Sequence, residues 1–184
     1  MTQPTPERAS RRWLTGVRLH KAAWVFGASV VSMAILGAAA VILREPWVFP
    51  SLGPTAFLLF FAPGGPQSGA RNVIAGHGIG VAAGVLALAM FGLLHTPVDL
   101  EDLSWQRAAA AVTCVGVTLG AMVLLNVPHA PAGATTLIVG LGLMTTIGEL
   151  TVLMLAVITL TLIAFVLNRY IGPVVLGGAR QSGT

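Results

Sequence analysis

The sequence predicts an all-α integral membrane protein with two three-element repeats of inverted orientation, each containing one broken segment. Three observations predict this fold. Hydrophobic residues make up 55% of the 184 residues and charged residues only 9%, against about 25% charged residues in an average soluble domain. Long uncharged apolar stretches recur along the chain, and two further apolar stretches are interrupted by proline and glycine. A soluble globular domain and a disordered chain are both excluded, because the first needs a polar surface and the second is poor in apolar residues.

Residues 1–21 form a basic segment that we expect to be cytoplasmic. It holds five of the ten Lys and Arg residues. Basic residues flanking an apolar stretch favour the cytoplasmic side of a membrane. The charge is therefore explained by orientation in the bilayer, and nucleic acid is not an expected partner.

The first long apolar stretch, residues 22–43, predicts a transmembrane helix of about 33 Å. A secretory signal peptide is the alternative for residues 1–43. The apolar part of a signal peptide is usually about 7–15 residues long, whereas a membrane span needs about 20. We therefore predict a retained transmembrane helix.

The second apolar stretch, residues 46–66, is broken near its middle by Pro50, Gly53 and Pro54. A helix through both prolines is disfavoured. We predict a short helix over residues 51–61, because its first residue is a serine, a good N-cap type, and Pro54 falls in the first turn. Extended residues 47–50 would add about 13 Å to a helix of about 16 Å, which together approach a hydrocarbon core of about 30 Å.

The rest of the chain repeats this order of elements. We predict long spans over residues 72–94, 108–126 and 150–167, and a second short helix over 132–145 after a break at 127–131.

An offset of 80 residues places Gly53 on Gly133 and Thr55 on Thr135. Repeat one then covers 22–94 and repeat two 105–171. Both lie in a single transmembrane domain over 22–171, which a flexible tail at 172–184 follows.

Two topologies are open for the broken segments. If both cross the membrane, the chain crosses six times, Arg71 is cytoplasmic and the acidic loop 95–107 lies outside. If both re-enter, the chain crosses four times and Arg71 lies outside. We favour six crossings, with both termini cytoplasmic, which makes the two halves inverted relative to each other.

The two breaks are the predicted site. Non-helical backbone at membrane depth is tolerated only where protein or water covers it, and paired breaks in two halves point to a transport site. The first N–H groups of each short helix lack intrahelical partners and carry the positive end of the helix dipole, so two such ends near the midplane would bind an anion. Gly53 and Gly133 would let the ligand approach the backbone, and hydroxyl donors would come from Ser51, Thr55, Thr135 and Thr136. The alternative is that these small residues serve helix packing alone.

Two histidines are further candidates. His129 lies at the second break and His77 in the span at 72–94. An ionisable residue inside a membrane segment is a functional candidate by default, and an imidazole could donate to an anion or carry a proton. The alternative for His129 is a neutral imidazole bonded to a freed carbonyl. Asn72 is expected to be an N-cap, and the glycines of GHGIG at 76–80, with Gly84, are expected to form a close-packing face.

The stretches SLGPTAFLLF (51–60), RNVIAGHGIG (71–80) and HAPAGATTLI (129–138) resemble the three signature stretches of the HPP family of integral membrane proteins. The resemblance covers roughly residues 20–171. The His-Pro-Pro motif that names the family reads His-Ala-Pro here. Plant and cyanobacterial relatives are associated with nitrite transport, so the resemblance implies a small-anion permease. It also implies binding roles for Ser51, Leu52, Gly53, Asn72, His77, His129, Pro131 and Gly133.

We therefore expect a transporter or channel for a small inorganic anion, such as nitrite, in a bacterial inner membrane. No enzyme is expected, because no nucleophile–base pair or carboxylate pair appears inside the spans. Neither a metal nor a cofactor is expected: the histidines lack ligand spacing, and the single cysteine, Cys114, allows neither a thiolate metal site nor an internal disulfide. A homo-oligomer is expected. The alternative function is a non-transporting assembly subunit that packs against a partner protein; a cation pathway is disfavoured because no Asp or Glu lies inside the spans.

Overall fold

The computed structural model describes residues 6–175, with side chains from residue 16 onward. Within this part of the chain all regular structure is helical, which confirms the predicted fold class. The elements in chain order are α1 (Pro6–Leu43), α2 (Leu52–Phe61), a 3₁₀ turn η1 (Pro66–Ser68), α3 (Ala70–Met90), α4 (Trp105–Leu124), α5 (Ala132–Gly140), α6 (Ile147–Val166) and a π-helical turn η2 (Leu167–Ile171). Helical conformation continues to Val175, so only residues 176–184 of the predicted tail lie outside the described residues.

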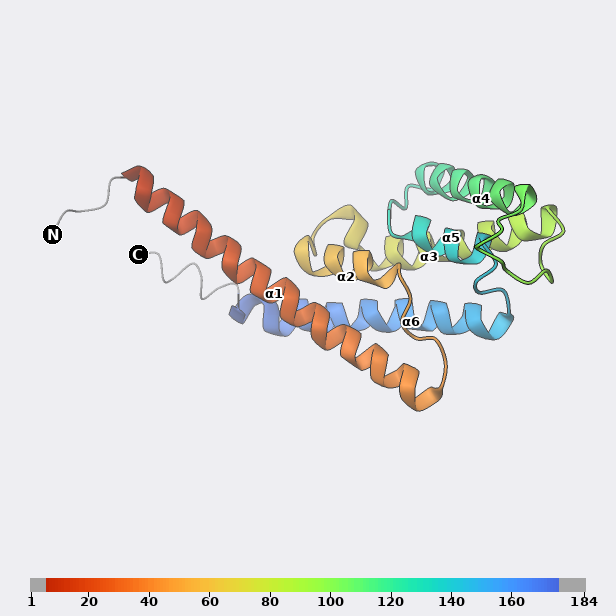
Figure 1. Ribbon diagram of the computed structural model, residues 1–184. Coiled ribbons are helices and arrows are strands. Elements are labelled where there is room, and N and C mark those ends of the chain that lie inside the picture. Colours follow the sequence, from red (N-terminus) through yellow and green to blue (C-terminus); the bar gives the residue numbers. More distant parts are fainter. Residues whose placement is uncertain (1–5, 176–184) are drawn as a thin grey trace.

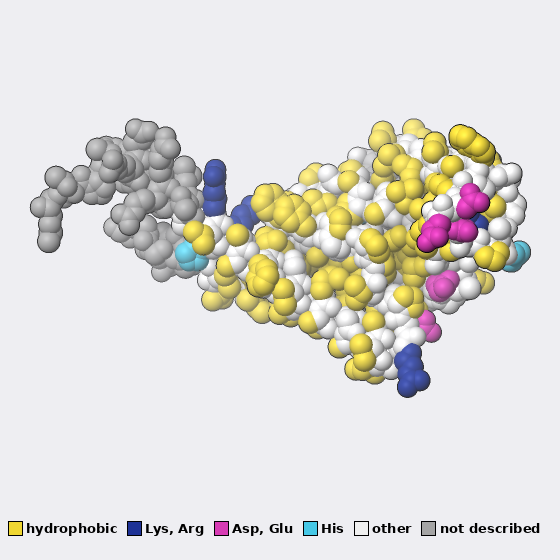
Figure 2. All heavy atoms as spheres, in the orientation of Figure 1, with side chains coloured by type: hydrophobic (Ala, Val, Ile, Leu, Met, Phe, Trp, Pro, Cys, Tyr) yellow, Lys and Arg dark blue, Asp and Glu magenta, His cyan; other side chains and the backbone are white. Residues whose placement is uncertain are grey.

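Four helical segments are long and apolar enough to cross a membrane: Gly16–Leu43, Ala70–Met90, Trp105–Leu124 and Ile147–Val175. Their outer faces expose large apolar side chains, which cover much of the surface in Figure 2. Such a surface suits lipid rather than water. The helix α1 begins before the predicted span at residue 22, because the apolar stretch marks the part suited to the bilayer and not the start of the helix.

Helix α3 is the centre of the bundle. It contacts α4, α5 and α6, while α1 packs against α2 and α6 (Figure 1). The short helices α2 and α5 start close to each other and run in opposite directions from that place (Figure 1). This brings the two predicted breaks together, although the internal repeat itself stays a prediction.

The glycine face predicted on α3 is confirmed by how closely α5 lies against it. A Cβ atom added at Gly76 would lie 2.9 Å from the His129 Cβ, and one at Gly80 would lie 2.7 Å from the Thr136 Oγ1. One at Gly84 would lie 2.7 Å from Val139. Glycines at every fourth position therefore allow α5 to rest on the backbone of α3.

Three helices end earlier than predicted, each for the same reason. Gly92, Asn126 and Gly142 adopt left-handed φ values of 69°, 52° and 81°. Each directly follows the C-cap residue of its helix and donates its N–H back to the last turn, as in a Schellman motif. The predicted ends at 94, 126 and 145 are therefore wrong, and α3, α4 and α5 end at Met90, Leu124 and Gly140.

The start of α6 is fixed by a capping box. Thr146 accepts a hydrogen bond from the N–H of Glu149, and the Glu149 carboxylate accepts from the N–H of Thr146 and of Thr145, each at 3.0 Å. These reciprocal bonds satisfy backbone donors at the first turn of α6.

Arg107 lies in the first turn of α4 and links this helix to the end of α5. Its side chain is buried, although the sequence places it in an acidic loop. Its guanidinium donates to the carbonyl of Leu141 at 2.9 Å and to those of Thr96 and Pro97 at 3.1 Å each. One side chain thereby joins the start of α4 to the loop after α3 and to the end of α5.

Candidate functional site

A buried polar cluster joins the starts of α2 and α5 to α3. Its side chains are at most 1% exposed, and they are Ser51, Thr55, His77, His129 and Thr135. The Ser51 Oγ lies 2.7 Å from the Thr135 Oγ1, which lies 2.7 Å from the His77 Nδ1. The His77 Nε2 lies 3.2 Å from the His129 Nε2. All five residues are among the candidates predicted from the sequence.

The local sequence explains why these side chains meet. Ser51 immediately precedes α2, and Thr55 lies one helical turn further on the same face. Thr135 lies in the first turn of α5, and His77 lies on the face of α3 that carries the small residues Gly76 and Gly80. Because those glycines let α5 approach, the imidazole of His77 reaches hydroxyls from both short helices.

The carbonyl of Gln67 sets the direction of the hydrogen bonds in the cluster. It lies 2.7 Å from the His129 Nδ1 and can only accept, so His129 carries its proton on Nδ1. The His129 Nε2 then accepts from the His77 Nε2–H, which leaves the His77 Nδ1 to accept from the Thr135 hydroxyl. Thr135 in turn accepts from the Ser51 hydroxyl. These proton positions follow from the network rather than from observed hydrogens.

Thr55 completes the cluster. Its hydroxyl donates to the carbonyl of Ser51 at 2.8 Å, and its oxygen lies 3.1 Å from the His77 Nε2 and 3.3 Å from the His129 Nε2. Every polar side-chain atom of the cluster therefore has a partner. In the described part of the chain, the Trp47 Nε1 is the one buried side-chain nitrogen or oxygen without one.

The sequence reasoning missed Gln67. This residue lies in the turn η1 between α2 and α3. Besides the carbonyl that accepts from His129, its side-chain oxygen accepts from the N–H of Ala130 at 3.0 Å. The only sign in the sequence was one amide side chain within a turn rich in proline and glycine.

The helix starts offer fewer free N–H groups than the sequence predicts. In α5 the N–H groups of Ala132, Gly133 and Ala134 donate to the carbonyls three residues before them, at 3.0–3.1 Å. The chain enters α5 through a tight turn, so 3₁₀-type bonds satisfy these donors. The prediction of free donors is therefore wrong for α5. In α2 the N–H of Gly53 has no acceptor among the described residues.

The remaining predicted glycines and apolar residues lie outside the cluster, and their binding roles stay predictions. An added Cβ at Gly53 or Gly133 would meet no atom within 4 Å, so neither position is crowded. Leu52 is fully buried in the main apolar core, and Pro131 occupies the N-cap position of α5.

Ser51 is at the N-cap position of α2 as predicted, but its side chain makes no capping bond. Its hydroxyl is bonded instead to Thr135. The predicted N-cap position is therefore correct, but the Ser51 side chain does not bond to the backbone of the helix as a cap would.

Thr136 and Asn72 lie outside the cluster. The Thr136 hydroxyl donates to the carbonyl of Ala132 and lies 2.8 Å from the Thr118 Oγ1, so it joins α5 to α4. The Asn72 amide donates to the carbonyl of Pro66 at 2.7 Å, and Gly69 occupies the N-cap position of α3. The N-cap prediction for Asn72 is therefore wrong, because the helix begins earlier than expected.

The fold also creates a contact that spacing along the chain did not reveal. The Thr135 hydroxyl donates to the His77 imidazole, which is the geometry of a nucleophile beside a base. The expectation that no such pair occurs inside the spans is corrected in this respect. Thr135 is fully buried and also bonded to Ser51, so a substrate could not reach it in this arrangement.

An open groove lies on the outer side of the two helix starts. Its volume is about 580 Å³, and its lining includes Gly53 and Pro54 of α2, Pro131 and Ala134 at the start of α5, and Gln67. Gly53 and Ala134 are close neighbours in sequence of the cluster residues Ser51 and Thr135. The groove therefore lies beside the α2–α5 junction.

Long apolar helices and a polar cluster enclosed by them define an integral membrane protein. The chain belongs to the HPP family, since the profile of the HPP transmembrane region matches residues 15–173. This confirms the resemblance seen in the three sequence stretches. A search of curated proteins and a search of solved structures each gave no match.

Proposed function

We propose that this HPP-family protein moves a small inorganic anion, such as nitrite, across a bacterial inner membrane by way of the polar cluster. The observation that carries the proposal is a fully buried group of hydroxyls and imidazoles at the junction of two short helices. Polar groups inside a membrane domain are costly and tend to mark substrate or proton pathways. Both broken segments contribute to this one cluster.

The chemistry of the cluster suits an anion better than a cation. Its side chains are neutral hydrogen-bond donors and acceptors, and none is a carboxylate. The acidic residues among the described side chains lie in loops or in the first turn of α6: Glu45, Asp99, Glu101, Asp102 and Glu149. Cation pathways are usually lined by Asp or Glu. An anion entering between α2 and α5 would accept from the Ser51 hydroxyl in place of the Thr135 oxygen.

The hydrogen-bond chain also offers a route for a proton. A proton given to the Ser51 oxygen would displace the original Ser51 proton to Thr135, the Thr135 proton to the His77 Nδ1, and the His77 Nε2 proton to the His129 Nε2. His129 would then be an imidazolium held by the carbonyl of Gln67. Each hydroxyl would point the opposite way, and the new Ser51 proton would face the anion. If the anion arrives together with its proton as a weak acid, its arrival therefore leaves a positive charge on the buried His129 imidazole.

The test is anion flux in proteoliposomes that contain only this protein. Nitrite, nitrate, formate and chloride are compared with and without a proton gradient. Thr135→Val keeps the side-chain volume and removes the hydroxyl, so we expect it to abolish most of the flux. The matched control is Thr161→Val, because Thr161 is a buried threonine whose hydroxyl donates only to the carbonyl of Val157. Protein that is folded but moves none of these anions would contradict the proposal.

A second candidate is a non-transporting assembly subunit. One observation favours it, because every polar side-chain atom of the cluster is already satisfied within the protein. This candidate predicts no flux from the purified protein and a loss of stability in Thr135→Val, because the buried Ser51 Oγ and His77 Nδ1 would each lose a partner. The homo-oligomer expected from the sequence would be one form of such packing.

A further inference from the structure

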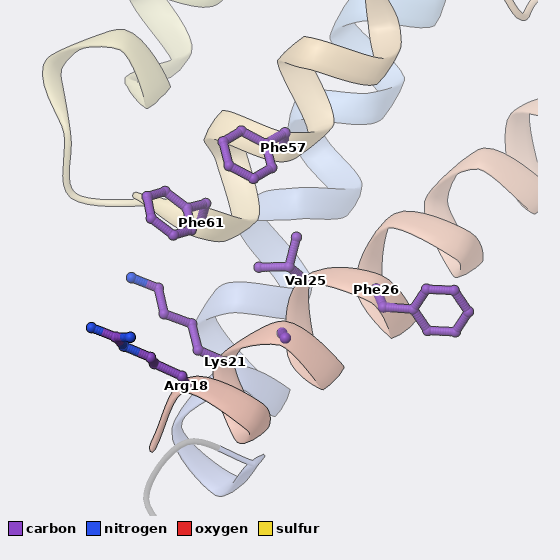
Figure 3. Close-up of a pocket in the computed structure, with 7 residues that line it drawn as sticks. Arg18, Lys21, Val25, Phe26, Phe57 and Phe61 are labelled. Carbon is purple, nitrogen blue, oxygen red and sulfur yellow. The ribbon is translucent and has the colours of Figure 1, made fainter. Parts of the chain in front are cut away.

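We infer that a pocket between α1 and α2 binds an anionic phospholipid, with its phosphate on Arg18 and Lys21 and an acyl chain against the phenylalanines of the pocket. The pocket has a volume of about 660 Å³ (Figure 3). It is separate from the polar cluster, and the inference does not depend on transport.

The pocket lies beside a contact between α1 and α2. In that contact the rings of Trp24 and Phe60 pack edge to face, with centroids 6.2 Å apart, and both are buried. Next to this contact, Phe57 and Phe61 stack on α2 with ring centroids 4.9 Å apart. Val25 faces them from α1 (Figure 3). The apolar wall is therefore formed by two helices that the Trp24–Phe60 contact holds together beside the pocket.

Both basic side chains of the pocket come from one face of α1. Arg18 and Lys21 are three residues apart, so they lie on neighbouring turns. Figure 3 shows both side chains directed toward the Phe61 side of the pocket, and the Lys21 Nζ lies 4.0 Å from the centre of the Phe61 ring. None of the described residues that line the pocket is acidic. Figure 2 shows the described acidic side chains gathered toward the right of the view, so none of them would repel a phosphate bound here.

The apolar wall favours a lipid over a free anion. Phe57 is 50% exposed and Phe26 is 72% exposed, and a small anion would leave both rings uncovered. A phospholipid would cover them while its phosphate neutralised the two cations. Basic pockets between transmembrane helices are known to take anionic headgroups. Arg18 and Lys21 also immediately precede the apolar stretch that starts at residue 22, where headgroups are expected.

The experiment uses the full chain, purified and delipidated in dodecyl maltoside. Phosphatidylglycerol with brominated acyl chains is titrated, and quenching of tryptophan fluorescence is read, because Trp24 packs against Phe60 in the helix contact beside the pocket. Brominated phosphatidylcholine and inorganic phosphate are the comparison probes. Arg18→Gln/Lys21→Gln is compared with Arg44→Gln/Arg71→Gln, which removes two exposed basic residues that do not line the pocket. Circular dichroism confirms that each variant is folded.

We expect saturable quenching by phosphatidylglycerol, weakened on the order of tenfold or more in the pocket variant and little changed in the control variant. Three outcomes would overturn the inference. Equal affinity for phosphatidylcholine would show that headgroup charge is not recognised. An equal loss in the control variant would show general attraction to net charge. If inorganic phosphate competes for the pocket with an affinity equal to that of phosphatidylglycerol, the pocket is a free-anion site instead.

Discussion

The approach of α5 to α3 predicts that Gly80→Ala destabilises the protein. The added Cβ would lie 2.7 Å from the Thr136 Oγ1 and 2.9 Å from the carbonyl oxygen of Ala132. Backbone cannot rotate away as a side chain can. The Thr136 hydroxyl is itself held by bonds to Ala132 and Thr118, so α5 would have to shift as a unit.

The size of the effect follows from two opposing contributions. Overpacking a buried site costs about 1–3 kcal/mol, whereas replacing glycine by alanine in a helix contributes up to about 1 kcal/mol. We expect Gly80→Ala to lower the free energy of unfolding by about 1–2 kcal/mol. The matched control is Gly78→Ala on the same helix, whose Cβ would make one ordinary contact, at 3.9 Å from the Met154 Cε. That variant should gain up to about 1 kcal/mol.

The assay is reversible unfolding of both variants in mixed micelles of dodecyl maltoside and dodecyl sulfate, followed by circular dichroism. The decisive quantity is the difference between the two variants, about 2 kcal/mol in favour of Gly78→Ala. Because both substitutions add the same methyl group to the same helix, differences in detergent binding should nearly cancel. If Gly80→Ala is as stable as Gly78→Ala, the close contact between α3 and α5 is refuted.

Three further predictions use the same unfolding assay or simple labelling. Arg107→Gln leaves buried carbonyls without a donor and should cost about 2 kcal/mol, and Arg107→Lys should not restore stability because an ammonium cannot reproduce the fork of the guanidinium; full stability of either variant would contradict the contacts. Thr146→Ala removes one half of the capping box and should cost about 1 kcal/mol, whereas Thr146→Ser should be nearly neutral; an unchanged Thr146→Ala variant would refute that role. Cys114 is fully buried against Gly140 and should resist a maleimide in the folded protein but react after denaturation, as mass spectrometry would show; rapid labelling of folded protein would contradict this burial.

The sequence predicted the membrane helices and the two short helices because both rest on local rules. Apolar length identifies a span, and Pro54 in a first turn identifies a helix start. The starts of α2 and α5 were predicted to within one residue. The ends were less accurate, because Asn126 and Gly142 act through left-handed φ values that apolar counting does not register.

The candidate site was predicted in its residue types but not in its contacts. Ser51, Thr55, His77, His129 and Thr135 were selected because each lies at or near a break. That they form one hydrogen-bond chain depends on α3 lying between the breaks, which no spacing along the chain shows. The contact of Gln67 with His129 depends on its backbone carbonyl, which any residue type would supply, and its side-chain bond to Ala130 joins two segments far apart in the sequence.

The buried polar cluster itself bears on the choice between the two proposed functions. A subunit that only packs against a partner needs close helix contact, and the glycine face of α3 already provides it. Adding imidazoles and hydroxyls to that contact contributes little to association in a membrane, since interhelical hydrogen bonds there are worth on average about 0.6 kcal/mol. Apolar residues that filled the same space would pack equally well, and no polar group would have to be buried. A hydrogen-bond chain whose polarity can reverse, placed where two helices are interrupted, is what a conducting site requires. On the transport proposal, the saturated bonds would describe a closed state, in which the Ser51–Thr135 bond occupies the Ser51 donor that an anion would use.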